Sequence, residues 1–383
     1  CPGRMSATTT VTQDDLQSGI DRVVSVVPRT SALPVTDNVL VEPHAAGYVD
    51  LTTTDLSVWA RTRIPARNAS TPVTTIPARK LKELTARLEA GDVELALSGE
   101  RMRIASGRSR FNLNTGEAEA FPRPPKLPWE TGFDLPGSVL ASMAGPATAT
   151  VSAEGSRSPA LHNVLWETSG GTLTLVSTDG HRLTRIRRKL DAATGEHRRV
   201  VPVRALSTAV AQLAKAEKVR VAFDDTRVGF RSDLVEIVAS LVADPYPDYT
   251  VLLRPTVPYA RVMEVSREAF HAAVDRMAVL ASDQTHRLIL NLSGGEVALS
   301  VQTPDLGTAE ESVPASLTLP GGAFRIAFNA EYLLGLLGSL TCEDVRFSFG
   351  ESENAAFISP TVDPEKAGEE VTMLCMPLRI LEA

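Results

Sequence analysis

The residues best suited to acid-base chemistry stand together in one short segment that contains Asp179, His181 and Arg182. A carboxylate, an imidazole and a guanidinium are the groups that a hydrolase or a phosphotransferase would use. Residues two positions apart in a turn do not by themselves form a catalytic triad, and the chain has no P-loop, nucleophile elbow or His-Glu-x-x-His helix. The segment therefore favours a non-catalytic protein, and an enzyme is the weaker alternative.

Lysine and arginine residues on two predicted helices form a second group of candidates. Helical spacing places Lys80 and Arg87 on one exposed face, and it places Arg204 and Lys215 on one exposed face of a later helix. Such cations can bind phosphate groups, although a solvated helix face is the simpler interpretation of each pair taken alone. Only their recurrence at similar places supports a phosphate-binding surface, and the pattern is incomplete because the last predicted helix, residues 331–340, has no lysine or arginine.

The whole-chain charge neither supports nor excludes that interpretation. The formal net charge is −7, which argues mildly against nucleic-acid binding. Net charge is a sum over the molecule, however, and a basic inner surface with an acidic outer surface would give the same total.

The elements that must position these residues occur three times. Segments of alternating apolar residues begin at positions 93, 219 and 345, so each starts 126 residues after the one before. The helix-like stretches that precede them are residues 76–81, 201–206 and 328–333. A fixed period in a chain of 383 residues predicts three copies of one domain.

The first and third copies show the clearest local signals. Thr12 is a predicted N-cap, with Asp15 completing a capping-box variant, and Pro28 ends the helix. Ser266 caps the corresponding helix of the third copy, and a Ser-Gly-Gly turn at residues 293–295 joins two strands. In the first copy we predict further strands and a helix at residues 39–42, 48–53, 57–64, 78–89 (the helix), 93–98, 102–106 and 110–114.

The middle copy is the least regular of the three. Its first helix should cover residues 137–143, but Gly145 and Pro146 follow at once and predict a short or distorted helix. The two halves of each copy look alike, which indicates that the unit is itself a duplication. The linkers at residues 121–125 and 245–258 are rich in proline, which keeps chain segments extended.

Composition places the chain among ordinary globular proteins. It is 43% hydrophobic and 22% charged and has no apolar stretch long enough to span a membrane. Residues 1–4 resemble an expression remnant before Met5. The two remaining cysteines, Cys342 and Cys375, form no disulfide framework and no zinc pattern, so we expect a reducing cytoplasm and no metal or other cofactor.

Four segments resemble one known family, the bacterial DNA polymerase III β subunit or ring-shaped sliding clamp. Residues 178–183 resemble its strand-turn-strand signature, and residues 106–111 resemble its first-domain edge strand. Residues 247–249 are similar to the segment before its second linker, and residues 376–380 are similar to its C-terminal tail. The four lie in the family's order on the threefold period, which makes the resemblance specific.

The resemblance implies an α+β fold of three clamp domains, each with two helices backed by antiparallel sheets. The domains would be residues 6–129, 130–257 and 258–383. Two chains, head to tail, would form a six-domain ring around duplex DNA. Such a clamp performs no chemistry and tethers the replicative polymerase, the clamp loader and repair polymerases, which bind through short peptide motifs. The main alternative is a non-catalytic interaction module that does not bind DNA.

The resemblance also assigns sites. The cleft for partner peptides would comprise Leu161, Thr178, Gly180, His181, Arg182, Leu183, Pro247, Asn329, Tyr332, Met376, Pro377, Leu378 and Arg379. An adaptable apolar pocket with polar tips suits that role. The alternative is an ordinary turn beside an ordinary C-terminal strand.

Two further sites follow from the same resemblance. For DNA it indicates Arg29, Arg79 and Arg204, beside the helical cations Lys80, Arg87 and Lys215, and the alternative is unremarkable surface cations. For ring closure it indicates an edge strand with Arg108, Phe111 and Leu113, which would meet Val279 and Leu280 of the other subunit. Phe111 and Leu113 alternate as a half-buried strand requires, and an intradomain core is the alternative.

Overall fold

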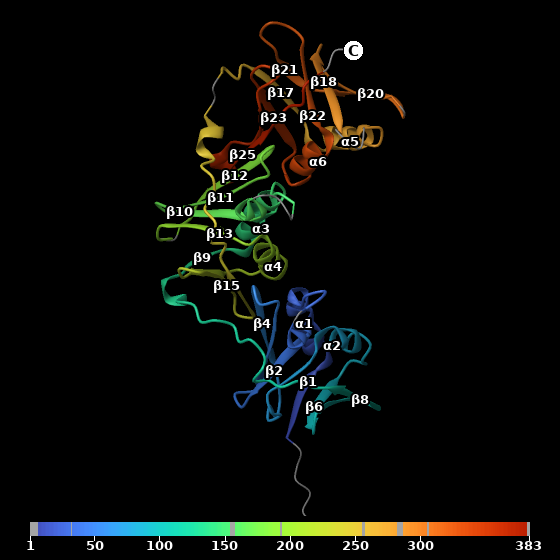
Figure 1. Ribbon diagram of the computed structural model, residues 1–383, viewed down its shortest axis with the longest axis vertical. Coiled ribbons are helices and arrows are strands. Elements are labelled where there is room, and N and C mark those ends of the chain that lie inside the picture. The colour runs from blue at the N-terminus through green and yellow to red at the C-terminus, as the bar shows by residue number, and fades with distance from the viewer. Residues whose placement is uncertain are drawn as a thin grey trace, which may run out of the picture. The chain divides into compact units, whose positions relative to one another are not determined.

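The computed structural model describes residues 7–31, 33–153, 158–191, 194–254, 257–281, 286–304 and 306–380 (Figure 1). The predicted expression remnant at residues 1–4 and the predicted outer ends of the first and third copies, residues 6 and 383, lie outside these ranges. The chain divides into two compact units. Unit 1 holds the described residues up to Leu140 together with Arg204–Leu241, and unit 2 holds Ala141–Val203 together with those from Val242 onward.

The first copy has the predicted elements in the predicted order, but its first helix ends at Val23 and a 3₁₀ turn at Val24–Val26 follows, so the predicted end at Pro28 is wrong. Thr12 caps the first helix, and its hydroxyl accepts a hydrogen bond from the amide of Asp15. The elements are β1 (Thr8–Thr12), α1 (Gln13–Val23), β2 (Asn38–His44), β3 (Tyr48–Thr54), β4 (Val58–Pro65), β5 (Thr74–Pro77), α2 (Ala78–Thr85), β6 (Asp92–Ser98), β7 (Arg101–Ser106) and β8 (Ser109–Asn114). Each half is therefore one strand, one helix and three strands.

The second helix of this copy is shorter than predicted. It ends at Thr85, whose hydroxyl donates to the carbonyl of Leu81, and the amide of Arg87 then turns back to Leu84. A threonine hydroxyl that bonds to the preceding turn weakens a helix at that point. The prediction that Lys80 and Arg87 share one helical face is thus wrong, because Arg87 follows the helix.

The middle copy repeats the order and corrects two predictions. Its elements are β9 (Phe133–Leu135), α3 (Gly137–Thr148), β10 (Val164–Ser169), β11 (Thr172–Thr178), β12 (Arg182–Lys189), β13 (His197–Val201), α4 (Val203–Leu213), β14 (Val219–Phe223), β15 (Arg227–Arg231) and β16 (Val235–Ser240). Helix α3 runs past Pro146, because a proline near a helix end removes only one intrahelical hydrogen bond. Helix α4 stops before Lys215, so Arg204 and Lys215 do not share a helical face.

The third copy confirms the predicted cap and turn. The Ser266 hydroxyl accepts from the amide of Ala269, and Gly294 and Gly295 take positive φ between their strands. The elements are β17 (Arg261–Ser266), α5 (Arg267–Ala278), β18 (Arg287–Ser293), β19 (Glu296–Thr303), β20 (Gly307–Pro314), β21 (Ser316–Thr318), β22 (Phe324–Asn329), α6 (Ala330–Gly338), β23 (Asp344–Phe349), β24 (Ala356–Pro360), α7 (Pro364–Ala367) and β25 (Glu370–Cys375).

Sheets continue from one copy into the next. In unit 1 one sheet runs β5-β2-β3-β4-β16-β15-β14-β9, and in unit 2 another runs β13-β10-β11-β12-β25-β24-β23-β17-β21. The two joins, which we call the first seam (β4 with β16) and the second seam (β12 with β25), are antiparallel. The remaining sheets, β1-β6-β7-β8 in unit 1 and β20-β19-β18-β22 in unit 2, have four strands each.

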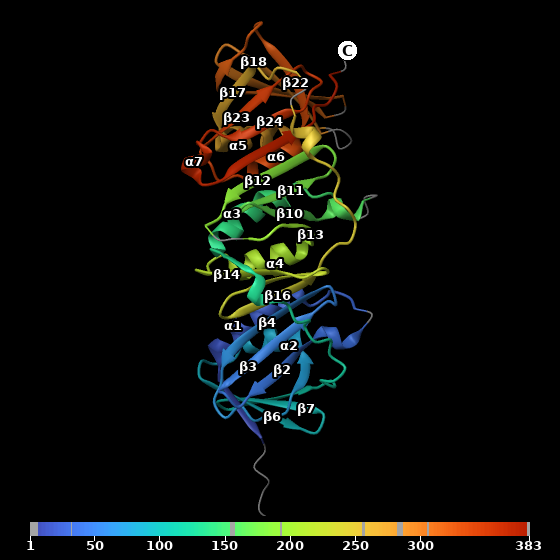
Figure 2. The same ribbon diagram turned by 90° about the vertical axis from the view of Figure 1, so that its left-hand side faces the viewer.

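Paired helices cover the sheets of each unit. In unit 1 helix α1 packs on β3 and β4 beside α2, burying Leu16, Ile20 and Val23 (Figure 2). In unit 2 helix α5 packs beside α6, and its Phe270 meets Phe347 of β23 edge to face at 5.6 Å. No helix in the described part of the chain is long and apolar enough to cross a membrane.

Candidate DNA-binding and partner-binding surfaces

Three of the predicted DNA-binding arginines gather around one hollow in unit 1. Arg29 follows the 3₁₀ turn Val24–Val26, and Arg79 and Arg204 are the second residues of α2 and α4. All three are exposed and line a cavity of about 440 Å³ together with residues of the segment 24–30. We call this the arginine hollow. Segments far apart in the sequence thus present their guanidinium groups to a common space.

Hydrogen bonds hold two of these arginines in place. Arg79 donates to the carbonyls of Val27 and Pro28 at 3.1 and 3.0 Å. Arg204 donates to the carbonyl of Val26 at 2.8 Å and forms an ion pair with Asp55 at 2.6 Å. Arg29 has no hydrogen bond or ion pair with another described residue. Fixed arginines with spare donors suit a phosphate oxygen, which carries no sequence information.

The other three predicted DNA-binding cations do not line this hollow. Lys80 is paired with Glu83 at 2.9 Å, and Arg87 donates to the backbone carbonyl of the same residue at 2.5 Å. Lys215 is exposed beyond the end of α4. An exposed lysine–glutamate pair three residues apart contributes little energy, so Lys80 stays available to an anion.

The predicted partner surface in unit 2 is built on a hydrogen-bonded turn between β11 and β12. The Thr178 hydroxyl donates to the carbonyl of Arg182 at 2.5 Å and accepts from the amide of Gly180 at 3.1 Å. The Asp179 carboxylate accepts from the amides of His181 and Arg182 at 2.9 and 2.7 Å. Gly180 adopts φ +89°, which favours glycine. The turn therefore fixes His181 and Arg182.

Aromatic contacts connect this turn to the third copy. The Arg182 guanidinium lies 4.5 Å from the Tyr332 ring centroid, and the His181 ring lies 5.8 Å from the same ring. Asn329 caps α6 by accepting from the amides of Glu331 and Tyr332. Burial raises the pKa of the Tyr332 hydroxyl, which stays a neutral donor. The turn at residues 178–183 and the start of α6, which were predicted to form one surface, are therefore in contact.

The C-terminal tail completes the surface. Strand β25 ends at Cys375, and the Met376 amide donates to the carbonyl of His181 at 2.9 Å. The amide of Leu378 donates to the carbonyl of Ala327 at 2.7 Å. Met376 is 45% exposed, and Pro377 and Leu378 are half-buried, while Arg379 is exposed. The tail is therefore not a continuation of the strand, and an exposed methionine offers an adaptable apolar contact.

An apolar cluster underlies the turn. Leu183 is buried with Tyr246 and Tyr249, and Leu161 packs against them, while Pro247 lies exposed between the two tyrosines. All predicted residues of this surface therefore lie on connected elements of unit 2.

Sequence reasoning did not assign to this surface the residues that support it. Asp179 organises the turn, Tyr246 forms its floor, and the Tyr249 hydroxyl donates to Glu167 at 2.6 Å. Burial and the Glu167 carboxylate raise the pKa of Tyr249 to about 12. The sequence repeat could have indicated Tyr246. Phe121 stands 125 residues before it and is buried in the corresponding cluster of the first copy.

The predicted dimer residues lie at an open sheet edge in unit 1 and at the end of a helix in unit 2. Strand β8 pairs only with β7, and its Phe111 and Leu113 are half-buried opposite the fully buried Ile104 and Met102. Arg108 is exposed beside them. In unit 2, Val279 is 78% exposed and Leu280 is half-buried, directly after α5. Partial burial at an edge is unlike a completed intradomain core.

The acid-base candidates are not arranged as a catalytic site. Asp179 is bound to two amides and forms an ion pair with Arg182 at 2.9 Å, so neither group is free for proton transfer. Across the described ranges, no group of three or more His, Cys, Asp or Glu residues is placed to hold a metal ion.

Three family models cover nearly the whole chain. They describe the N-terminal, central and C-terminal domains of the DNA polymerase III beta subunit, and they match residues 8–126, 135–248 and 256–379. The order of the matches agrees with the threefold period of the sequence.

Curated relatives and solved structures agree with these models. The beta sliding clamp of Salmonella typhimurium is 28% identical over 374 residues, which cover 97% of this chain and 99% of that protein. The DNA polymerase III subunit beta of Pseudomonas aeruginosa superposes with a TM-score of 0.88 at 26% identity, over 97% of this chain and all of that one. The Bacillus subtilis DNA polymerase sliding clamp has a TM-score of 0.90 at 23% identity over 98% and 100%, which supports the fold.

Proposed function

The chain belongs to the DNA polymerase III beta subunit family, and from this premise we propose that it encircles duplex DNA and tethers the replicative polymerase and other partners. It is a sliding clamp and not an enzyme. The observation that carries the proposal is the threefold construction, with sheets that continue from copy to copy. We keep the domain bounds at 6–129, 130–257 and 258–383, and we assign the clamp to the cytoplasm, where DNA is replicated.

Ring closure follows from the strand order. Each seam joins the last strand of one half-copy to the last strand of another, β4 to β16 and β12 to β25. Two such strands remain unpaired on one side, β8 in unit 1 and β20 in unit 2. Pairing β8 of one chain with β20 of a second would build two further eight-stranded sheets and close a head-to-tail dimer. It would also cover both open edges.

Charge supports this pairing. Strand β8 carries Arg110 and follows Arg108, whereas β20 carries the exposed Glu310 next to Glu311, which is already paired with Arg276. Phe111 and Leu113 would then meet Val279 and Leu280. Complementary charge at the rim guides association, while the apolar residues supply most of the binding energy.

The arginine hollow is the proposed DNA contact. Arg29, Arg79 and Arg204 would bind phosphate oxygens, with Lys80, Arg87 and Lys215 adding weaker electrostatic attraction. Contacts to phosphate alone permit sliding, which a mobile tether requires. Asp55 neutralises part of Arg204, so this hold should be weak.

The predicted partner surface is the proposed dock for short peptides of the polymerase catalytic subunit, the clamp loader and repair polymerases. Met376, Pro377 and Leu378 would contact apolar anchors, and His181 and Arg182 would set their register. A peptide of the type Gln-Leu-x-Leu-Phe should bind saturably and shift the NMR signals of His181 and Met376. Absence of saturation at high micromolar peptide would contradict this site.

Disrupting the open edge tests the proposed ring. Replacing Phe111 and Leu113 together with aspartate should yield monomers that no longer remain on circular DNA, because two charges would be buried at the interface. Asn112→Asp, an exposed position on the same strand, is the matched control. Molar mass in solution and retention on nicked circular DNA are the measurements. An unchanged dimer in the double variant would refute the interface, and no DNA retention by the wild type would favour an interaction module.

A further inference from the structure

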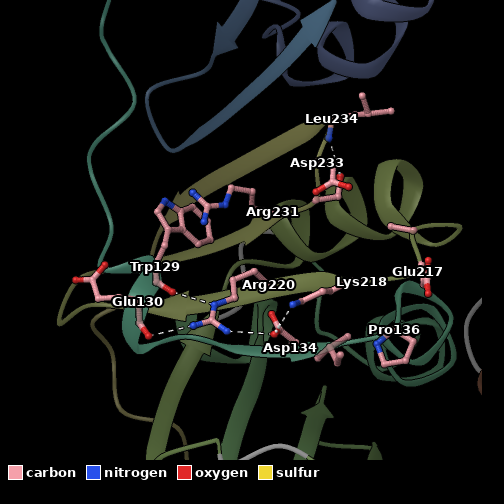
Figure 3. A pocket seen from close by; sticks show the side chains of 13 residues that line it. Trp129, Glu130, Asp134, Pro136, Glu217, Lys218, Arg220, Arg231, Asp233 and Leu234 are labelled. Carbon is pink, nitrogen blue, oxygen red and sulfur yellow. Dashed lines mark hydrogen bonds and ion pairs between the residues drawn. The ribbon is translucent and has the colours of Figure 1, made fainter.

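We propose that a hollow in unit 1, distinct from the predicted partner surface, docks a short basic and apolar peptide segment of a protein partner. This linker hollow has a volume of about 1220 Å³ and lies where the 3₁₀ turn Trp129–Thr131, which connects the first two copies, meets the sheet (Figure 3). Its walls come from Trp129, strand β9, the turn before β14 and the turn between β15 and β16. The inference goes beyond the proposed function.

The cations of the linker hollow are already engaged. Lys218 pairs with Asp134 at 3.0 Å, and Arg220 bonds to the same carboxylate at 3.2 Å and to the carbonyl of Trp129 at 2.9 Å. The Arg231 guanidinium lies over the Trp129 ring, 4.3 Å from its centroid (Figure 3). The two arginines are therefore held in place, whereas Lys218, whose side chain is 69% exposed, can still meet an anion.

The carboxylates of the hollow are mostly unpaired. Glu130, Glu217 and Asp233 are exposed and form no ion pair with a described residue. Asp134 uses one oxygen for both of its cations, and its Oδ1 is buried without a hydrogen-bond partner in the described ranges. The surplus of negative charge disfavours nucleic acid and attracts lysine or arginine side chains.

The apolar residues of the hollow favour a peptide over a small polyamine as its ligand. Leu234 is 52% exposed at the rim, and Trp129 and Pro136 also line the hollow. The volume exceeds the range of about 300–1,000 Å³ that is typical for small ligands, and it leaves room for several side chains. A leucine beside carboxylates matches a segment in which apolar and basic residues alternate.

The test uses two labelled peptides and fluorescence anisotropy. The probe is fluorescein-Leu-Arg-Leu-Lys-Leu-Arg, and the control is the same peptide with glutamine in place of each basic residue. The wild-type protein should bind the basic probe at least about tenfold more tightly than the glutamine peptide. Equal affinity for the two peptides would overturn the proposal.

Variants locate the binding. Glu217→Lys combined with Asp233→Lys should weaken the probe by about tenfold or more, whereas Glu119→Lys, an exposed position of unit 1 outside the hollow, should not. Leu234→Ser should weaken it by about fivefold through lost apolar contact. Met376→Asp should leave probe binding unchanged. An equal loss in Glu119→Lys, or a loss in Met376→Asp, would contradict the assignment.

A competition experiment separates the peptide from a polyamine. Spermidine at equal concentration should displace little of the probe, because it lacks apolar side chains. Full displacement by spermidine, together with an unchanged affinity of Leu234→Ser, would show that the hollow recognises amines alone and would reject the peptide. All substituted residues are exposed, so the variants should retain the wild-type thermal midpoint.

Discussion

The turns beside the first and second seams share a backbone but differ in their side chains. In residues 54–58 and in residues 178–182, a threonine hydroxyl donates to the carbonyl four positions on and accepts from the amide two positions on. In both, the following aspartate accepts from two backbone amides. The amides of Ser240 and Met376 then donate to equivalent carbonyls at 2.9 Å. The repeat has preserved this network.

The side chains on that network give the two turns different contacts. At the second seam Arg182 reaches Tyr332, and the exposed Met376 is available to a partner. At the first seam the equivalent of Met376 is Ser240, and Asp55 instead holds Arg204 of the arginine hollow. On the proposed assignments, the same turn would serve protein recognition at the second seam and DNA contact at the first, depending on a few side chains.

The largest expected effect is a difference between the two seams in their affinity for a partner peptide. Met376→Asp should weaken a Gln-Leu-x-Leu-Phe-type peptide by about a hundredfold or more, because it places a charge where an apolar anchor would pack. Ser240→Asp, at the equivalent position, should leave binding unchanged. Anisotropy titrations of a labelled peptide would measure both. Equal losses in the two variants would show that the seams are not functionally distinct.

The next effect concerns stability and should be common to both seams. Asp179→Ala and Asp55→Ala each remove a carboxylate that accepts two amide hydrogen bonds, so each should lower the free energy of unfolding by about 1–3 kcal/mol. Only Asp55→Ala should also change DNA binding, since it releases Arg204. Urea denaturation and DNA titration would provide the values. No loss of stability in either variant would mean that the turns hold without their aspartates.

A smaller effect should distinguish the third residue of each turn. Gly180 has φ +89° and Leu56 has φ +77°, so both occupy the left-handed region. Gly180→Ala should cost about 1 kcal/mol, whereas Leu56→Gly should relieve strain and cost little or nothing. Thermal midpoints would report the two changes. A marked loss in Leu56→Gly would indicate that the exposed leucine makes a stabilising contact.

The effect that should be smallest near neutral pH is a pH dependence that the second seam has and the first lacks. Burial raises the pKa of the Cys375 thiol from 9.0 to about 12, whereas Ala239 at the equivalent pairing position has no ionisable group. The unfolded thiol ionises first, so the stability from this group is present below pH 9 and is lost as pH rises toward 12. Cys375→Ala should flatten the alkaline fall in the urea midpoint, and Cys342→Ala should flatten it less.

Local signals made much of the fold predictable. The caps at Thr12 and Ser266 and the turn at residues 293–295 depend on neighbouring residues, and the structure confirms all three. The end of α4 could not be predicted in this way. The carbonyl of Ala216 accepts from the amide of Gly137, at the start of a different helix, and a Cβ at Gly137 would meet Leu213 and Ala216. A contact between distant segments thus sets that helix end.

The two candidate surfaces differ in the same way, because one depends on neighbouring residues and the other on contacts between distant segments. The residues around the turn at 178–183 are contiguous, so a resemblance could locate them from the sequence. The gathering of Arg29, Arg79 and Arg204 depends on the carbonyls of Val26, Val27 and Pro28 after α1. No local pattern encodes those hydrogen bonds, and none marks the linker hollow, whose carboxylates belong to separate elements.

The seams mean that the three repeats are not separable building blocks. The compact units cut through the middle repeat, leaving β14–β16 with the first and β10–β13 with the third. A gene fragment that ended at a repeat boundary would leave β4 or β12 with a bare edge prone to aggregation. Truncations and fusions should therefore keep both strands of each seam in the same polypeptide, β4 with β16 and β12 with β25.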